Sequence, residues 1–307
     1  MNILVTGGAG FIGSHVVDSY LQAGHAVVII DDLSTGSMKN VNAEAQFYRL
    51  DIRSEEVEEV FRRHNFDVVN HHAAQMNVRK SVADPVFDAS VNVVGSLNIF
   101  ELARKYGARK IIFASTGGAI YGEQDHFPAD EDHSLRPLSP YGVTKLASER
   151  YLFYYRQVHG LDYVILRYAN IYGPRQNPLG EAGVVAIFCN KMLKGGEPII
   201  NGDGKQTRDY TYVDDVVKAN VLALGYARSN IFNVGTGIET SVNDVFHALR
   251  RSLNPSCPER HGPPKEGEQR RSVISYGRIQ AELGWEPGVK LEEGLRSTAE
   301  YFKKMAG

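Results

Sequence analysis

The sequence contains few cysteines, no long run of like charges and no regularly spaced histidines. Its two cysteines, Cys189 and Cys257, lie far apart without the spacing of a metal-binding or redox motif, and a reduced cytoplasm is the simpler expectation. The 34 basic and 36 acidic residues are mixed along the chain, which argues against nucleic acid or an anionic membrane as a partner. The histidines, His71 and His72 among them, show no metal-ligand spacing, so we expect no metal site.

A targeting segment, internal repeats and a flexible linker are also missing from the pattern. Apolar alternation begins at Ile3, which leaves no room for a signal peptide, and we expect no stretch long enough to span a bilayer. The 307 residues, 43% of them hydrophobic, predict one large domain or two unequal ones around a sizeable core.

The first half alternates short β-branched runs with longer helical patterns, which is typical of repeated βαβ units. Strands are predicted at 2–6, 26–30, 46–49, 68–71, 110–114 and 163–167, and helices at 11–23, 55–64, 85–106 and 141–159. After about Ala169 the alternation weakens, with strands predicted near 198–200 and 231–234 and helices near 214–226 and 242–252. The sequence therefore predicts an α/β fold, with a doubly wound parallel sheet at 1–168 and a smaller, interleaved C-terminal α/β part at 169–307 that faces the substrate.

Glycines follow the first predicted strand at the turn into the first helix. A tight turn needs Gly7, close approach of the backbone to a pyrophosphate needs Gly10, and close helix packing needs Gly13. The amides at Phe11 and Ile12 would face the phosphates from the positive end of the helix. Asp31 ends the second strand, where a carboxylate can bind the adenosine ribose and would repel a ribose phosphate. This pattern predicts a Rossmann-type dinucleotide site that prefers NAD to NADP.

Several further residues are candidate contacts of the cofactor. Asp31 and Asp32 have a solvated turn as their alternative. Asp51 could accept a hydrogen bond from the adenine amino group, or equally well cap the following helix. Small residues after the fourth strand would let the backbone approach the cofactor, although a simple turn is an alternative. The candidates in this group are Ile52, Ala73, Ala74, Gln75 and Asn92.

Tyr141 and Lys145 are four residues apart at the start of a predicted helix, so their side chains share one face. A nearby ammonium and a positive nicotinamide ring would both lower the pKa of the tyrosine from about 10 toward neutrality. Tyr141 could then remove a hydroxyl proton while hydride leaves the same carbon. The spacing alone is common on amphipathic helices, but downstream of the glycine motif it predicts catalysis.

Segments 6–13, 115–122 and 139–145, together with Asp31, resemble the extended short-chain dehydrogenase/reductase family of NAD-dependent epimerases and dehydratases. The chain is most similar to the UDP-glucose 4-epimerases, from Met1 to segment 283–287. This resemblance implies NAD as cofactor, a UDP-sugar as substrate and epimerisation at C4. The alternatives are an epimerase or reductase of another nucleotide sugar, such as UDP-glucuronate or a dTDP-hexose, and a non-catalytic NAD-binding regulator.

The family's third catalytic member is a Ser or Thr four residues before the tyrosine of a Tyr-Gly pair. Here the pair is 121–122, and the position four back is Gly117. Either Thr116 shifts inward, or a water replaces the hydroxyl. Dehydratases that resemble this chain need Asp and Glu at the next two positions, where Gly118 and Ala119 stand, so the resemblance favours epimerisation over elimination.

The resemblance also implies contacts with the nucleotide sugar. Tyr168 would lie against the nicotinamide, with a packed core aromatic as its alternative, and Asn170 would donate to a substrate phosphate. Other candidate substrate contacts are Thr116, Gly117, Gly118, Tyr141, Val184, Val185, Arg208, Tyr210 and Arg270. Ser272 is small where some similar epimerases carry Tyr, which predicts tolerance of N-acetylated hexoses. The helices at 85–106 and 141–159 resemble those that pair across a homodimer.

Overall fold

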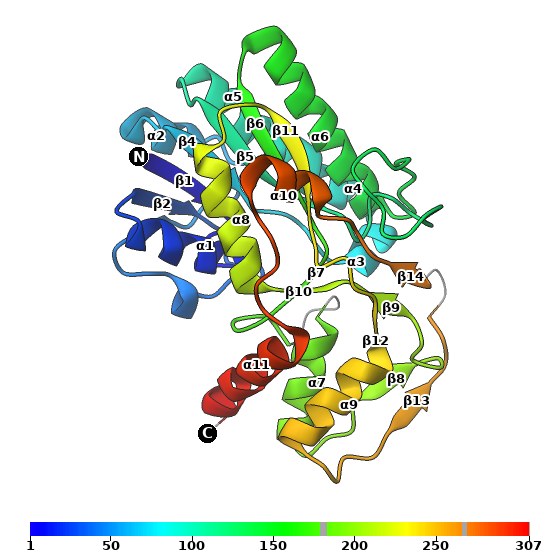
Figure 1. The fold of residues 1–307 in the computed structure, drawn as a ribbon. Helices are drawn as coiled ribbons and strands as arrows, with labels where there is room; N and C mark the ends of the chain where they lie inside the picture. The colour runs from blue at the N-terminus through cyan, green and yellow to red at the C-terminus, as the bar shows by residue number, and fades with distance from the viewer. Residues whose placement is uncertain (179–182, 266–268, 307) are drawn as a thin grey trace.

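A seven-stranded parallel sheet forms the centre of the computed structural model, which describes residues 1–178, 183–265 and 269–306 (Figure 1). The strands run in the order β11, β6, β5, β4, β1, β2, β3. Their bounds are β1 Asn2–Thr6, β2 Ala26–Ile30, β3 Gln46–Tyr48, β4 Val68–His71, β5 Lys110–Thr116, β6 Asp162–Tyr168 and β11 Asn230–Val234. The chain order reverses between β1 and β4, which is where doubly wound sheets bind ligands. The predicted Rossmann-type fold is confirmed.

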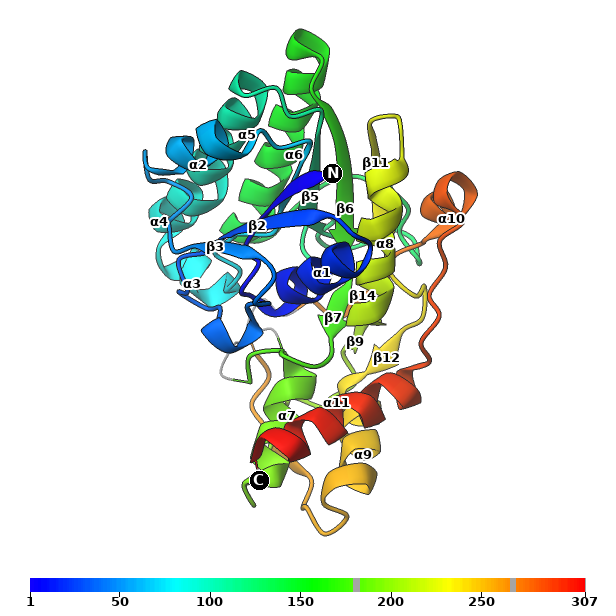
Figure 2. The same ribbon diagram turned by 90° about the vertical axis from the view of Figure 1, so that its left-hand side faces the viewer.

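Helices cover both faces of this sheet (Figure 2). One face carries α1 (Phe11–Gln22), α8 (Val213–Gly225) and α10 (Gly277–Leu283), and the other carries α2 (Val57–His64), α5 (Ser96–Lys105) and α6 (Pro140–His159). Along β1, Ile3 and Val5 pack toward the first layer and Leu4 toward the second. This alternation follows from the strand geometry, and all three side chains are apolar because both faces are buried.

The helix predicted at 85–106 is present as a continuous run of three pieces. They are α4 (Pro85–Ala89), a π-helical turn (η2, Ser90–Gly95) and α5. The run Pro85–Lys105 is long and apolar enough to cross a membrane by length and composition alone, so the expectation that no stretch has this length is wrong. Its inward residues Ile99, Phe100 and Ala103 are fully buried in the core of the fold, which accounts for the apolar composition.

The smaller part lies beyond the carboxyl ends of the central strands (Figure 1). Its strands form three small sheets, which pair β7 (Asn170–Tyr172) with β10 (Tyr210–Tyr212), β8 (Ile199–Asn201) with β13 (Arg260–Gly262), and β9 (Thr207–Arg208) with β12 (Thr240–Ser241) and β14 (Arg271–Ser272). Helices α7 (Val184–Leu193), α9 (Val242–Leu253) and α11 (Leu291–Ala306) enclose a separate core that includes Phe188, Phe246 and Leu295. Two short helices, η1 (Met38–Asn40) and α3 (Val78–Ala83), stand in loops of the sheet.

Two elements that were predicted in the smaller part are associated with the central sheet instead. One is a strand of that sheet, and the other is a helix that packs on it. Strand β11 pairs with β6, with Ile231 opposite Ile165, and α8 packs beside α1. Phe232 and Val234 are fully buried in the same core layer as α1. A short apolar run identifies a buried strand but not its partner, which is why the sequence did not indicate the pairing of β11 with β6.

Candidate active site

The loop between β1 and α1 is shaped by its glycines. Gly7 has a φ of +71°, and a Cβ there would stand 2.7 Å from the amide nitrogen of Ala73. A Cβ on Gly13 would collide with the carbonyl oxygen of Gly7, whereas one on Gly10 would meet only that oxygen, at 3.1 Å. Gly10 is also the N-cap of α1, and no side chain caps the helix there. The amide end of α1, at Phe11 and Ile12, is therefore shaped to receive a phosphate group.

Asp31 fastens this loop to the end of β2. Its Oδ2 accepts from the amide of Ala9 at 3.0 Å and its Oδ1 from the amide of Leu33 at 2.8 Å. Burial raises the pKa of Asp31, and the two amide bonds oppose that rise. Asp32 is exposed and accepts from Ser34 in a turn, as its alternative interpretation required. Asp31 thus lies beside the glycine loop, where the predicted ribose contact needs it.

The loop after β3 carries two of the predicted cofactor contacts, Asp51 and Ile52. Asp51 accepts from the amide and guanidinium of Arg53, and α2 begins only at Val57, after Glu56. The helix-cap alternative for Asp51 is therefore wrong. The buried Ile52 lies against Gly95.

The loop that contains Ala73, Ala74 and Gln75 is anchored to β1 and to the π-helical turn. Ala73 donates through its amide to Thr6 Oγ1 at 3.2 Å. Gln75 and Asn92 exchange two hydrogen bonds, from the Gln75 amide to Asn92 Oδ1 at 2.8 Å and from Asn92 Nδ2 to the Gln75 carbonyl at 2.9 Å. Asn92 therefore holds the loop in place, which is a role that the sequence did not indicate.

Tyr141 and Lys145 lie on one face of α6 as predicted, with Nζ of Lys145 6.0 Å from the Tyr141 ring centroid. The helix starts after Ser139, whose Oγ accepts from the amide of Gly142 at 3.1 Å. Lys145 Nζ donates to the carbonyl of Ala114 at 2.9 Å. Burial lowers the pKa of Lys145 to about 8 and raises the pKa of Tyr141. In the chain alone, burial and the charge of Asp88 raise the pKa of Tyr141. The predicted lowering, which includes the charge of the nicotinamide, stays a prediction.

Thr116 places a hydroxyl beside Tyr141, one residue before the position where the family pattern has it. Thr116 is the last residue of β5, and its side chain hydrogen-bonds to Tyr141, which favours the phenolate. A Cβ on Gly117 would stand 2.6 Å from Ile274 Cδ1, so Ile274 occupies the space that a side chain would need. Thr116 is thus within hydrogen-bonding reach of Tyr141, and its catalytic role stays a prediction. Its position follows from the end of the strand and not from the Tyr-Gly pair five residues later.

Ile274 was not predicted as part of the site. It is 1% exposed, and its amide donates to Oδ2 of the buried Asp209 at 3.4 Å. Asp209 also accepts from the amides of Thr236 at 2.8 Å and Gly237 at 3.1 Å. No sequence signal links Ile274 to Gly117, because the contact depends on how the C-terminal segment returns across the sheet.

Most of the predicted substrate residues lie in three places. Asn170, Val184, Val185 and Tyr210 line one small cavity, and Gly118 adjoins it, since a Cβ there would stand 3.4 Å from Asn170 Oδ1. The strand β14 places the buried Ser272 opposite Arg208. Arg270 forms an ion pair with Asp203 at 2.9 Å instead of lining the cavity. Of its side chain, 58% is exposed.

Tyr168 occupies the packed position that was its alternative interpretation. It is buried, its ring stacks on His72 at 6.1 Å between centroids, and its hydroxyl accepts from Asn220 Nδ2 at 2.8 Å. The nicotinamide contact of Tyr168 stays a prediction.

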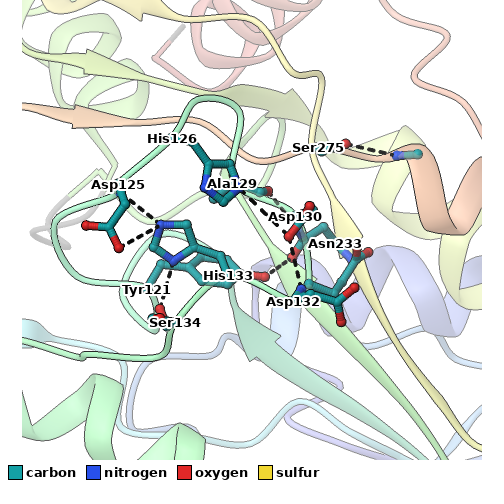
Figure 3. A network of polar contacts seen from close by, with 12 residues as sticks. Tyr121, Asp125, His126, Ala129, Asp130, Asp132, His133, Ser134, Asn233 and Ser275 are labelled. Atoms are coloured by element: carbon teal, nitrogen blue, oxygen red, sulfur yellow. Dashed lines mark hydrogen bonds and ion pairs between the residues drawn. The ribbon is translucent and has the colours of Figure 1, made fainter.

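The segment after Tyr121 is held by a polar network (Figure 3). The His133 ring packs edge-on against Tyr121, accepts from the amide of Asp125 at 2.9 Å and bonds the Ser134 carbonyl at 2.8 Å. The carbonyl of Ala129 accepts from Asn233 Nδ2 at 3.1 Å and from the amide of Ser275 at 2.7 Å. This segment therefore joins β11 to the stretch that carries Ile274.

Comparisons with known proteins agree with this geometry. The model of the NAD dependent epimerase/dehydratase family matches residues 3–235. A UDP-glucose 4-epimerase of Mycolicibacterium smegmatis is 46% identical over 99% of each chain. The crystal structure of a UDP-glucose 4-epimerase with UDP-glucose from Thermotoga maritima is 50% identical over 100% of both chains, with a TM-score of 0.98. A Thermus thermophilus UDP-glucose 4-epimerase in complex with NAD is 46% identical over 99% of each chain, with a TM-score of 0.94.

Proposed function

Because the chain belongs to the NAD-dependent epimerase/dehydratase family, we propose that it interconverts UDP-glucose and UDP-galactose by epimerisation at C4. The observation that carries this proposal is the hydrogen-bonded pair of Thr116 and Tyr141, with Lys145 on the same face of α6 and the glycine loop nearby in the fold. Gly118 and Ala119 supply no carboxyl group for elimination, so an epimerase fits this site better than a dehydratase.

The residues have separate tasks in this mechanism. The glycine loop and the first turn of α1 would hold the pyrophosphate of NAD, with Asp31 on its ribose. When bound, NAD takes up hydride from C4 and returns it to the opposite face. Tyr141 accepts the proton of the 4-hydroxyl and later returns one, and Thr116 orients that hydroxyl by hydrogen bonding. Lys145 favours the phenolate through its positive charge.

The hexose of the substrate must rotate while the nucleotide remains bound. The diphosphate is held on the smaller part, in the neighbourhood of Asn170, Val184 and Arg208, and the 4-keto hexose rotates to present its other face. Since no net oxidation occurs, NAD stays bound through turnover. The small Ser272 leaves the N-acetylated hexoses as candidate substrates, and measured activity on UDP-N-acetylglucosamine would test this.

We further propose that the protein is a cytoplasmic homodimer without membrane or nucleic acid partners. An apolar surface supports the dimer, since α3, α4, η2 and α6 expose large hydrophobic side chains. They are Val78, Val82, Val86, Val94, Val143, Tyr151, Phe153, Tyr154 and Val158. Such a concentration on neighbouring helices is typical of a protein interface.

The decisive experiment denatures the purified protein, identifies the released nucleotide, and assays conversion of UDP-galactose to UDP-glucose without added cofactor. We expect bound NAD, turnover, and loss of turnover in Tyr141→Phe. The matched control is Tyr301→Phe on α11, which should keep full activity. Bound NAD without turnover of either UDP-hexose would refute this function and favour another nucleotide sugar or a regulatory role.

A further inference from the structure

Asp88 is a carboxylate on α4 that is completely buried, with 0% of the residue exposed. Its Oδ1 accepts from the side-chain amides of Gln75 at 2.7 Å and Asn92 at 3.1 Å. Its Oδ2 accepts from the hydroxyl of Thr144 at 2.8 Å. All three donors are uncharged, so these bonds solvate the carboxylate without balancing its charge. A buried charge of this kind requires a nearby ion of opposite sign.

Lys145 is a buried positive charge that likewise has no charged hydrogen-bond partner among the residues that the structure describes. It is 3% exposed, and its ammonium donates to a neutral acceptor, the carbonyl of Ala114. Lys145 directly follows Thr144, the residue that binds Asp88. Asp88 and the turn of α6 that carries Lys145 therefore meet where α4 packs against α6, close enough for the two charges to interact. Asp88 is also the largest influence that raises the pKa of Lys145 against the effect of burial.

The other titratable groups around Lys145 do not supply a net negative charge. Glu149 lies one turn further along α6, but Arg167 matches its charge, with Nη2 to Oε2 at 2.7 Å and both side chains 2% exposed. His71 and His72 face Lys145 from the end of β4, and burial lowers the pKa of both, to about 3 for His72, so both are neutral. Tyr141 is neutral as well, since burial raises its pKa.

We propose that Asp88 is a positioning residue whose buried negative charge keeps Lys145 in its ammonium form beside Tyr141. This role rests on the proposed epimerase function. Neutralising Asp88 would let Lys145 lose its proton at lower pH, and above that pH Tyr141 would lose the positive charge that favours its phenolate. Below that pH, removal of the Asp88 charge, which itself raises the pKa of Tyr141, would favour the phenolate. The alkaline limb of the rate profile would move to lower pH, while activity at neutral pH would suffer less.

The test follows Lys145 directly, by 13C NMR of the protein labelled at the lysine Cε carbons and assigned with Lys145→Met. With its pKa at about 8, Lys145 titrates below the ordinary lysines. In Asp88→Asn we expect its midpoint, and the alkaline limb of kcat for UDP-galactose, to fall together by about one pH unit. Should Asn prevent folding, Asp88→Ser replaces it with the same expectation.

Asp84→Asn is the matched control. This variant makes the same substitution one turn earlier in the chain. The side chain of Asp84 caps α4 by accepting from the Phe87 amide, and Asn caps a helix equally well. A folded Asp88 variant with an unchanged Lys145 midpoint would overturn the proposal, and so would an equal shift in Asp84→Asn. Because the NMR titration needs no substrate, it separates this inference from the epimerase function, whose failure would appear as an inactive wild type.

Discussion

Replacing Gly117 by serine tests how the hydroxyl of the site is supplied. The substitution restores the hydroxyl four residues before Tyr121, where the family pattern has it. We nevertheless expect it to impair the enzyme. The new Cβ would stand 2.6 Å from Ile274 Cδ1 and 3.3 Å from the carbonyl of Arg167. Ile274 has little room to move, because it is buried and packs closely against Gly235 on its other side.

Overpacking of this kind costs about 1–3 kcal/mol of stability. The strain falls on the loop that carries Thr116, and a displacement of about 1 Å from Tyr141 is enough to lower kcat on the order of 100-fold. Urea unfolding and the conversion of UDP-galactose measure the two effects. In the double variant Gly117→Ser/Ile274→Ala, the smaller side chain at 274 makes room for the new serine. We expect kcat to recover at least about tenfold relative to Gly117→Ser, which corresponds to about 1.4 kcal/mol of activation free energy.

Ile274→Ala alone serves as the control. It should lose about 2–5 kcal/mol of stability through its cavity and retain most of kcat, because Thr116 stays in place. If Gly117→Ser equals or exceeds the wild type in kcat, the reasoning is refuted, and the hydroxyl would belong at 117 after all.

Three other variants give further expected outcomes. Gly13→Ala should abolish retained NAD, measured as nucleotide released on denaturation, because its Cβ collides with the glycine-loop carbonyl, whereas Gly225→Ala, with open space around it, should keep NAD. Glu149→Gln leaves the buried guanidinium of Arg167 without its carboxylate partner. We expect the free energy of unfolding, measured by urea titration, to fall by about 3–5 kcal/mol. An unchanged midpoint of urea unfolding would contradict this. Thr116→Val should lower kcat about 100-fold with little change in KM, and Thr116→Ser should restore it.

The parts of the fold that repeat a local pattern are predictable from the sequence. The strands at 2–6, 26–30 and 68–71 have the bounds that their apolar runs and closing turns predict. The face shared by Tyr141 and Lys145 follows from helical spacing. The two-residue strands β9, β12 and β14 escape prediction, because so short a strand is defined by its partner and not by its own pattern.

The parts of the site that depend on tertiary packing are not predictable in this way. Ile274 reaches Gly117 across more than half of the chain, and no periodicity joins the two. The pKa of Tyr141 is raised by burial and by the charge of Asp88, against which the hydrogen bond from Thr116 acts. Spacing along a helix reports which groups are neighbours, but it does not report how much solvent they have lost.

The pairing of β11 with β6 bears on how the chain acquires its structure during synthesis. Ile165 of β6 pairs with Ile231 of β11, which is synthesised much later. Until that later segment has left the ribosome, β6 has an unpaired parallel edge. Before α8 has been synthesised, the helix layer that contains α1 is also incomplete. An unpaired edge of this kind invites pairing with other chains, and contacts between distant segments form slowly. The nascent sheet therefore passes through an interval in which chaperone protection matters most, and this interval ends only when the eleventh strand emerges.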